Sequence, residues 1–242
     1  MFKTIDDLLT PNPYSRPGKK IQSIKGIVVH WVQNPRTSAR ANRNFFENRK
    51  AGATGYGSAH YIIDLNGDII RCIPEDELAY HVGAKEYKKD AISRLGSYPN
   101  NCTLGIECTH IDDTGKMTDE TYRSLVELTS ALVKKYKLTP ATDLYRHYDI
   151  TGKNCHKWFI DNEEQWKIFK EKTADPSNDA SPTSAELKLD KIKKTLSQNP
   201  AAWKTVQDEL LPFIIAFYNS NPGELIKLIN RINVPEQYLD AR

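Results

Sequence analysis

The strongest constraint on the fold is a set of short, largely apolar runs that alternate with longer amphipathic segments. Gly26–His30 and Thr103–Cys108 are two such runs, and their length and composition predict buried strands. Residues 58–64 and 69–74 flank Asn66-Gly67, a dipeptide that favours the tight turn of a β-hairpin. These patterns predict an α/β fold in which a mixed central β-sheet is flanked by helices.

The amphipathic segments predict the helices. Thr37–Lys50 has helical periodicity, and we expect Phe45 and Phe46 to face the core. Thr118 is placed to cap the N-terminus of a long helix. The apolar stripe of this helix consists of Leu125, Leu128 and Leu132.

Two further segments lead to a change in composition. Leu144–His147 is typical of a short strand, and Asn162–Lys172 of a closing helix. Residues 173–184 are rich in small, polar and proline residues, which indicates a linker. We therefore expect a domain over residues 1–172 and a small all-α domain over residues 185–242. Its helices are predicted at residues 185–196, 201–218 and 222–232.

Composition excludes some classes of protein. The 242 residues carry a formal charge of +3, which is too small for a nucleic-acid-binding surface. No apolar stretch reaches transmembrane length, so we expect no membrane insertion. The first residues lack the apolar centre of a secretory signal, so we expect synthesis in the cytoplasm without a signal peptide. Cys72, Cys102 and Cys108 are expected to be buried structural thiols.

Three residues predict a metal site. His30 ends the first apolar run, where a strand delivers a side chain to the edge of a sheet. His147 and Cys155 are separated by a turn-forming stretch that can fold back. Two imidazoles and one thiolate suit zinc and leave a fourth position for water, which indicates hydrolysis. The alternative for each single histidine, including His60 and His110, is a hydrogen-bonded structural role.

The order of several motifs resembles a known family. The motifs are Ile27–His30, Ser58–Asp64, Ala79–Gly83, Asn101–Glu107 and, after His147, Lys153–Cys155. Over residues 20–172 the chain is similar to the type-2 N-acetylmuramoyl-L-alanine amidases. That group includes phage and prophage endolysins and the peptidoglycan-recognition proteins.

The resemblance implies an activity and a set of site residues. It implies Zn²⁺ bound by His30, His147 and Cys155, and hydrolysis of the amide between N-acetylmuramic acid and L-alanine in peptidoglycan. It implies a proton-transfer role for Glu107. Lys153 is expected to stabilise the oxyanion, with a solvated loop lysine as the alternative. The residues expected to bind substrate are His81, Trp31 and Tyr56.

One departure bears on the mechanism. Some relatives carry a tyrosine directly before the histidine of the hairpin strand, where this chain has Ala59. The acid–base role then falls to Glu107, and Tyr56 could replace the missing tyrosine only if its loop curls inward.

Alternative functions stay open at this stage. The main expectation is an endolysin that lyses a Gram-positive host and acts on the cell wall after release from the cytoplasm. A second is a non-catalytic peptidoglycan-recognition protein of the same fold, although such binders often lose the cysteine ligand. A cytoplasmic zinc deaminase is a third, but the chain lacks the His-x-Glu and Pro-Cys-x-x-Cys elements. Residues 185–242 are expected to bind cell wall, with homo-oligomerisation as the alternative.

Overall fold

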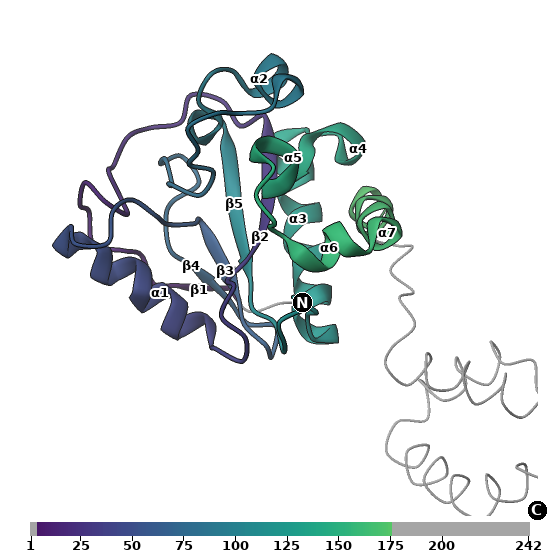
Figure 1. The fold of residues 1–242 in the computed structure, drawn as a ribbon, viewed down its shortest axis with the longest axis horizontal. Coiled ribbons are helices and arrows are strands. Elements are labelled where there is room, and N and C mark those ends of the chain that lie inside the picture. Colours follow the sequence, from purple (N-terminus) through teal and green to yellow (C-terminus); the bar gives the residue numbers. More distant parts are fainter. Residues whose placement is uncertain (1–3, 176–242) are drawn as a thin grey trace, which may run out of the picture. The chain divides into compact units, whose positions relative to one another are not determined.

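The structure is a computed structural model that describes residues 4–175 (Figure 1). The chain divides after Asp179 into two units, and all described residues belong to the first. The predicted helical domain at 185–242 lies outside the described residues, as does most of the predicted linker. The last described helix runs to Ala174, two residues into the segment predicted to be a linker.

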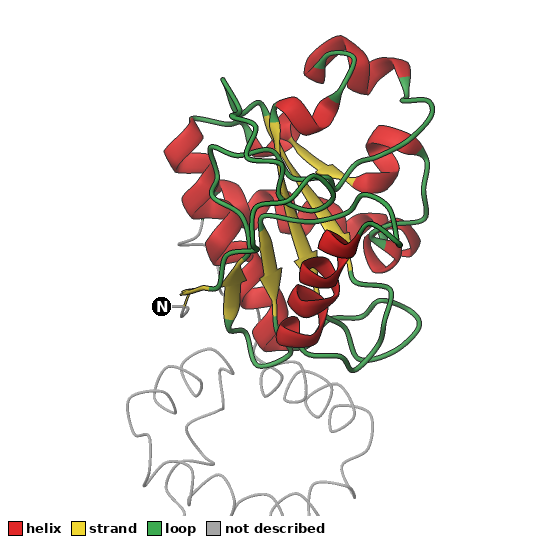
Figure 2. Ribbon diagram, turned by 90° about the vertical axis from the view of Figure 1, so that its left-hand side faces the viewer, coloured by secondary structure: helices red, strands yellow, loops and turns green. Residues whose placement is uncertain are grey.

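A six-stranded mixed sheet forms the centre of the first unit, in the order β1-β4-β3-β5-β2-β6 (Figures 1 and 2). Only β3 and β4 pair antiparallel, as the Asn66-Gly67 hairpin predicts. The other neighbouring strands are parallel. The strands are β1 (Thr4–Asp6), β2 (Gly26–Trp31), β3 (Tyr61–Ile63), β4 (Ile69–Arg71), β5 (Thr103–Cys108) and β6 (Leu144–Arg146).

The helices connect and cover these strands. They are α1 (Ala39–Asn48), α2 (Lys89–Leu95), α3 (Asp119–Tyr136), α4 (Pro140–Asp143), α5 (His147–Thr151), α6 (Lys157–Asp161) and α7 (Glu163–Ala174), with short 3-10 helices at Arg49–Ala51 and Pro99–Asn101. Thr118 caps α3 as predicted, since its side chain accepts the N–H of Thr121. None of the helices among residues 4–175 is long and apolar enough to cross a membrane.

One face of the sheet carries the main apolar core. Alternate residues of β2 and β5, such as Val29 and Ile106, point to this face and pack against α3, α6 and α7. The predicted stripe of α3 is buried here, together with Phe159 and Phe169. Figure 1 shows α3 behind β5 and β2. This continuous core makes the central strands a rigid support.

The opposite face is covered at two separate places. Ala39 and Phe46 of α1 pack over β3 and β4. At the β2–β6 side, a second cluster includes Val28, Ala91 of α2 and Ile150 of α5. Figure 1 shows α1 at lower left and α2 and α5 at the top, with β5 and β2 visible between them. Between the two clusters this face presents polar residues of β2 and β5.

The inward orientation predicted for Phe45 is wrong. Its side chain is 52% exposed, whereas Phe46 packs against the cluster beneath α1. Asn42 and Arg43 are buried instead, and the Arg43 guanidinium donates to the backbone oxygens of Asp7 and Leu8. The face of α1 toward the body is therefore partly polar, because it holds the N-terminal segment as well as the sheet.

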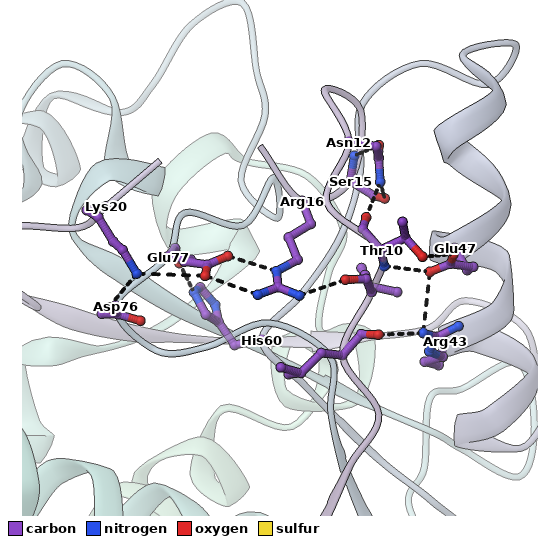
Figure 3. Close-up of polar contacts among 12 residues, drawn as sticks. Thr10, Asn12, Ser15, Arg16, Lys20, Arg43, Glu47, His60, Asp76 and Glu77 are labelled. Carbon is purple, nitrogen blue, oxygen red and sulfur yellow. Dashed lines mark hydrogen bonds and ion pairs between the residues drawn. The ribbon is translucent and has the colours of Figure 1, made fainter. Parts of the chain in front are cut away.

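Polar contacts hold residues 10–20 of the N-terminal segment against the rest of the domain (Figure 3). Glu47 of α1 accepts hydrogen bonds from the backbone N–H and hydroxyl of Thr10. Arg16 forms a bidentate ion pair with Glu77, at 2.8 and 3.1 Å. The backbone oxygen of Glu77 lies 2.9 Å from His60 Nε2. The N-terminal segment is thus tied to the residues beside the candidate site.

Candidate metal and catalytic site

Three parallel strands bring candidate residues to one level of the sheet. His30 of β2 lies directly beside Glu107 of β5 in the strand register. On the other side of β2, Val29 pairs with Arg146 of β6, so His147 follows at the level of His30. Because the carboxyl ends of parallel strands meet at the same edge, this arrangement follows from the topology.

A short loop adds Cys155 to the two histidines. The chain leaves β6 through α5, which is followed by Gly152 with φ +82°, a conformation that glycine adopts without steric cost. The chain then folds back, and the N–H of Tyr148 donates to the backbone oxygen of Cys155 at 2.7 Å. The turn expected between His147 and Cys155 therefore exists.

The three predicted ligands form a compact donor set. The candidate donor atoms of His30, His147 and Cys155 all lie within 4.8 Å of one another, and all three residues are buried. Cys155 Sγ lies 3.6 Å from His30 Nδ1. Zinc bonds of about 2.1 Å to nitrogen and 2.3 Å to sulfur at a tetrahedral angle separate those atoms by about 3.6 Å. His147 Nε2 is buried without a hydrogen-bond partner, so the donor set fits a zinc ion.

Burial keeps the donors of this set uncharged. It lowers the pKa of His30 well below its usual value and lowers that of His147 to about 4, with a further lowering by Lys153. Burial also raises the pKa of the Cys155 thiol. Two neutral imidazoles are ready to donate lone pairs, and a bound cation offsets the cost of forming the buried thiolate.

The side chain of Glu107 faces the space beside the three donors. Its carboxyl group holds its proton more tightly than usual. Its Oε2 is buried and has no hydrogen-bond partner. Burial raises the pKa of Glu107 to about 8, and the positive charge of Lys153 partly opposes the shift. A carboxyl group that titrates near neutral pH can both accept and donate a proton, as a general acid–base group must.

A cavity of about 790 Å³ opens beside these residues. Glu107, His147 and Lys153 line it together with Tyr56, which is 66% exposed. The ring of Tyr56 packs at 5.1 Å, centroid to centroid, from Tyr80. Tyr56 thus forms part of the cavity wall.

Of the two other residues predicted to bind substrate, Trp31 lies away from the cavity and His81 already has protein partners. Trp31 is not among the lining residues of the cavity; it is next to His30 in β2, so its side chain points to the opposite face. Its ring packs at 4.8 Å from that of His110. His81 does line the cavity, but both of its ring nitrogens contact protein atoms.

His60 has a hydrogen-bonded structural role, which is the alternative to metal binding. It is buried, its Nδ1 accepts the N–H of Gly105, and its Nε2 donates to the backbone oxygen of Glu77. The predicted structural thiols Cys72, Cys102 and Cys108 are free and buried.

Several residues of the site were not singled out in the sequence. Asn100 accepts the backbone N–H groups of His81 and Val82 with its side-chain oxygen, at 3.2 and 3.0 Å. The cavity is also lined by Arg49 and by Tyr80, Tyr87 and Tyr98. Tyr80 stands directly before His81, so the motif itself could have identified it. Nothing in the local sequence links Arg49 to the site.

Comparisons with known proteins agree with this geometry. The sequence profile of the family described as N-acetylmuramoyl-L-alanine amidase matches residues 20–158. A probable N-acetylmuramoyl-L-alanine amidase of Bacillus licheniformis is 35% identical over 172 residues, which are 71% of this chain and 47% of the relative. The chain therefore spans about half the length of this curated relative.

Solved structures share the fold at lower sequence identity. The PlyG catalytic domain matches with a TM-score of 0.59 and 19% identity, over 75% of this chain and all of that one. A mutant endolysin from Bacillus subtilis matches with a TM-score of 0.55 and 20% identity, over 70% of this chain and 99% of the other. Both matches bear out the predicted mixed sheet flanked by helices.

Proposed function

The chain belongs to the N-acetylmuramoyl-L-alanine amidase family, and we propose that it hydrolyses the amide between N-acetylmuramic acid and L-alanine in bacterial peptidoglycan with the help of a zinc ion. One observation carries the proposal. Three buried donor atoms, from His30, His147 and Cys155, lie within 4.8 Å of one another beside a cavity that Glu107 also lines.

Each part of this site has a role in amide hydrolysis. Zinc held by His30, His147 and Cys155 would supply Lewis-acid chemistry for polarising the scissile carbonyl and for activating water near neutral pH. Glu107 in its carboxylate form takes a proton from the attacking water at its unpartnered Oε2. It then returns that proton to the leaving amide nitrogen, so that the amine departs uncharged.

Lys153 stabilises the negative charge that develops on the carbonyl oxygen. Its side chain is exposed and lines the cavity, and its charge affects the pKa of Glu107 and of His147. A cation this close to the reacting groups lowers the energy of the oxyanion more than that of the uncharged amide. Tyr56, on the cavity wall, contacts the substrate.

We further propose that the protein acts as an endolysin on the walls of a Gram-positive host. The Bacillus source of the relative and the fold shared with a Bacillus subtilis endolysin support this assignment. Residues 185–242 then serve to hold the enzyme on its insoluble substrate, since a second anchor raises its effective concentration at the wall.

Digestion of purified Gram-positive walls tests the activity. Wild-type protein and Cys155→Ala are incubated with the walls, bound zinc is measured in both, and soluble products are analysed by mass spectrometry. We expect free stem peptides with a new L-alanine amino terminus from the wild type alone. Zinc binding without cleavage of any wall preparation would favour the peptidoglycan-recognition alternative, and the absence of bound zinc would overturn the ligand assignment.

A further inference from the structure

We propose that His81 is a positioning residue that holds His30 in the tautomer with its proton on Nε2, so that Nδ1 is free to bind the metal. This inference rests on the proposed zinc site. It replaces the substrate-binding role expected for His81 with a role in orienting the proposed metal ligand His30.

The two rings meet edge to face inside the protein. His30 Nε2 lies 3.0 Å from His81 Nδ1, and the ring planes are 87° apart. On the other side of the His30 ring, Nδ1 lies 3.6 Å from Cys155 Sγ. Both histidines are buried, so each nitrogen depends on its protein neighbours for a partner. Nδ1 is therefore the His30 nitrogen directed to the donor set.

The direction of the hydrogen bond follows from the far end of His81. His81 Nε2 lies 3.2 Å from the backbone oxygen of Thr103 and 3.2 Å from its hydroxyl oxygen. The hydroxyl of Thr103 already donates its single hydrogen to the backbone oxygen of Pro99 at 2.8 Å. Both oxygens facing Nε2 are thus acceptors, and His81 must carry its proton on Nε2.

The position of the proton on His30 then follows. With its proton on Nε2, a neutral His81 offers only a lone pair at Nδ1. His30 must donate to it, which places the His30 proton on Nε2 and leaves the lone pair on Nδ1. Metal-binding histidines commonly donate their second ring nitrogen in this way, which fixes both the tautomer and the ring orientation.

The surrounding chain holds His81 in place from two sides. Asn100 accepts the backbone N–H of His81 and that of Val82 with its side-chain oxygen. The His81 ring lies against Gly105 of β5, where an added Cβ would come within 2.5 Å of Cγ of His81. The strand therefore has room for this ring only because residue 105 has no side chain.

Nuclear magnetic resonance of metal-free protein labelled with ¹⁵N-histidine tests the tautomer without any activity measurement. Long-range ¹H–¹⁵N correlations distinguish a protonated ring nitrogen from a bare one. We expect His30 to be protonated at Nε2 and bare at Nδ1. A proton on Nδ1 of His30 in the wild type would overturn the proposal.

Zinc affinity of matched variants tests the consequence. In His81→Asn the side-chain oxygen takes the place of Nδ1 and can still accept from His30, whereas His81→Leu has similar bulk and no acceptor. We expect competition with a chromophoric chelator to give zinc binding about 10- to 100-fold weaker for His81→Leu. His81→Asn should stay within about threefold of the wild type, because it keeps the acceptor.

Thr103→Val is the control for this series. It keeps the backbone oxygen that accepts from His81 and removes only the hydroxyl, so zinc affinity should stay close to that of the wild type. Equal zinc affinity in His81→Leu and wild type would contradict the positioning role. Failure of the wild type to bind zinc would instead remove the proposed function and leave the tautomer measurement as the test of His81.

Discussion

At the scale of single residues, burial sets the protonation states that the chemistry requires. The same removal of water lowers the pKa of His147 to about 4 and raises that of Glu107 to about 8. The imidazole is therefore neutral and able to donate a lone pair, while the carboxyl group exchanges its proton near neutral pH. The proposed metal ligand His147 and the proposed acid–base group Glu107 thus obtain opposite shifts in pKa from the same buried environment.

Replacement of Glu107 separates proton transfer from metal binding. Glu107→Gln keeps the shape of the side chain and removes its ability to accept a proton. We expect zinc content to be unchanged and turnover of purified walls to fall by about a hundredfold or more. Near-normal turnover would exclude Glu107 from the mechanism.

The same variant has a pH-dependent effect on stability. The pKa of Glu107 is raised in the folded protein, so the folded state binds more protons than the unfolded state between about pH 4.5 and pH 8. Wild-type stability therefore falls as the pH rises through this window, and Glu107→Gln avoids that loss. In metal-free protein we expect the variant to be as stable as wild type at pH 4 and more stable at pH 9. The gain should be on the order of 5 kcal/mol, because folding raises the pKa of Glu107 from its usual 4.5 to about 8.

Urea unfolding of both metal-free proteins at the two pH values measures this difference. Equal unfolding free energies at pH 9 would show that Glu107 ionises without a burial penalty. The raised pKa would then be wrong.

At the scale of elements, local pattern predicted the long segments and missed several of the short ones. The hairpin, β2, β5, α1 and α3 follow from periodicity and turn residues, because each carries a complete local signal. β1, α2 and α5 contain only three, seven and five residues, too few for a periodic pattern to be distinct. Leu144–His147 was predicted as a strand, but β6 ends at Arg146 and His147 begins α5.

The sequence predicts which residues form the candidate site better than it predicts the contacts that support them. His30 at a strand end, and the turn between His147 and Cys155, carry chemical signals in the sequence. The contact of His81 with His30 joins residues 51 positions apart, and no local pattern encodes it. Phe45 was misplaced because hydrophobicity alone cannot show that Arg43 takes the buried side of α1.

A pair of substitutions compares a buried side chain of α3 with an exposed side chain of α1. Leu125 of α3 is fully buried in the main core, so Leu125→Ala should lower the free energy of unfolding by about 2–5 kcal/mol. Phe45→Ala removes a larger but 52% exposed side chain and should cost less than about 1 kcal/mol. Denaturant unfolding of both variants measures the contrast, and a larger loss in Phe45→Ala would contradict the orientation of α1.

At the scale of the whole molecule, the fold concentrates the chemistry on one side of a rigid sheet. The continuous core beneath α3 and α7 supports β2 and β5 from one face, and the opposite face stays open between two smaller clusters. Strand register then aligns His30 with Glu107. A site built on paired strands keeps its donor geometry better than a site built on loops alone.

Wall retention tests the role proposed for the C-terminal residues. The full chain and a version that ends at Asp179, both with Cys155→Ala to prevent digestion, are sedimented with purified walls. We expect the full chain to be retained more strongly, because a second attachment raises avidity. Equal retention of the two versions would contradict a wall-binding role for residues 185–242, and analytical ultracentrifugation of both would test self-association.

The most direct test of the proposed metal site is zinc X-ray absorption spectroscopy of the metal-loaded full chain. We expect a four-coordinate ion with one sulfur at about 2.3 Å and three nitrogen or oxygen neighbours at about 2.0–2.1 Å, two of them imidazole. Cys155→Ala should lose the sulfur contribution. A zinc shell without sulfur in the wild type would contradict the joint assignment of His30, His147 and Cys155.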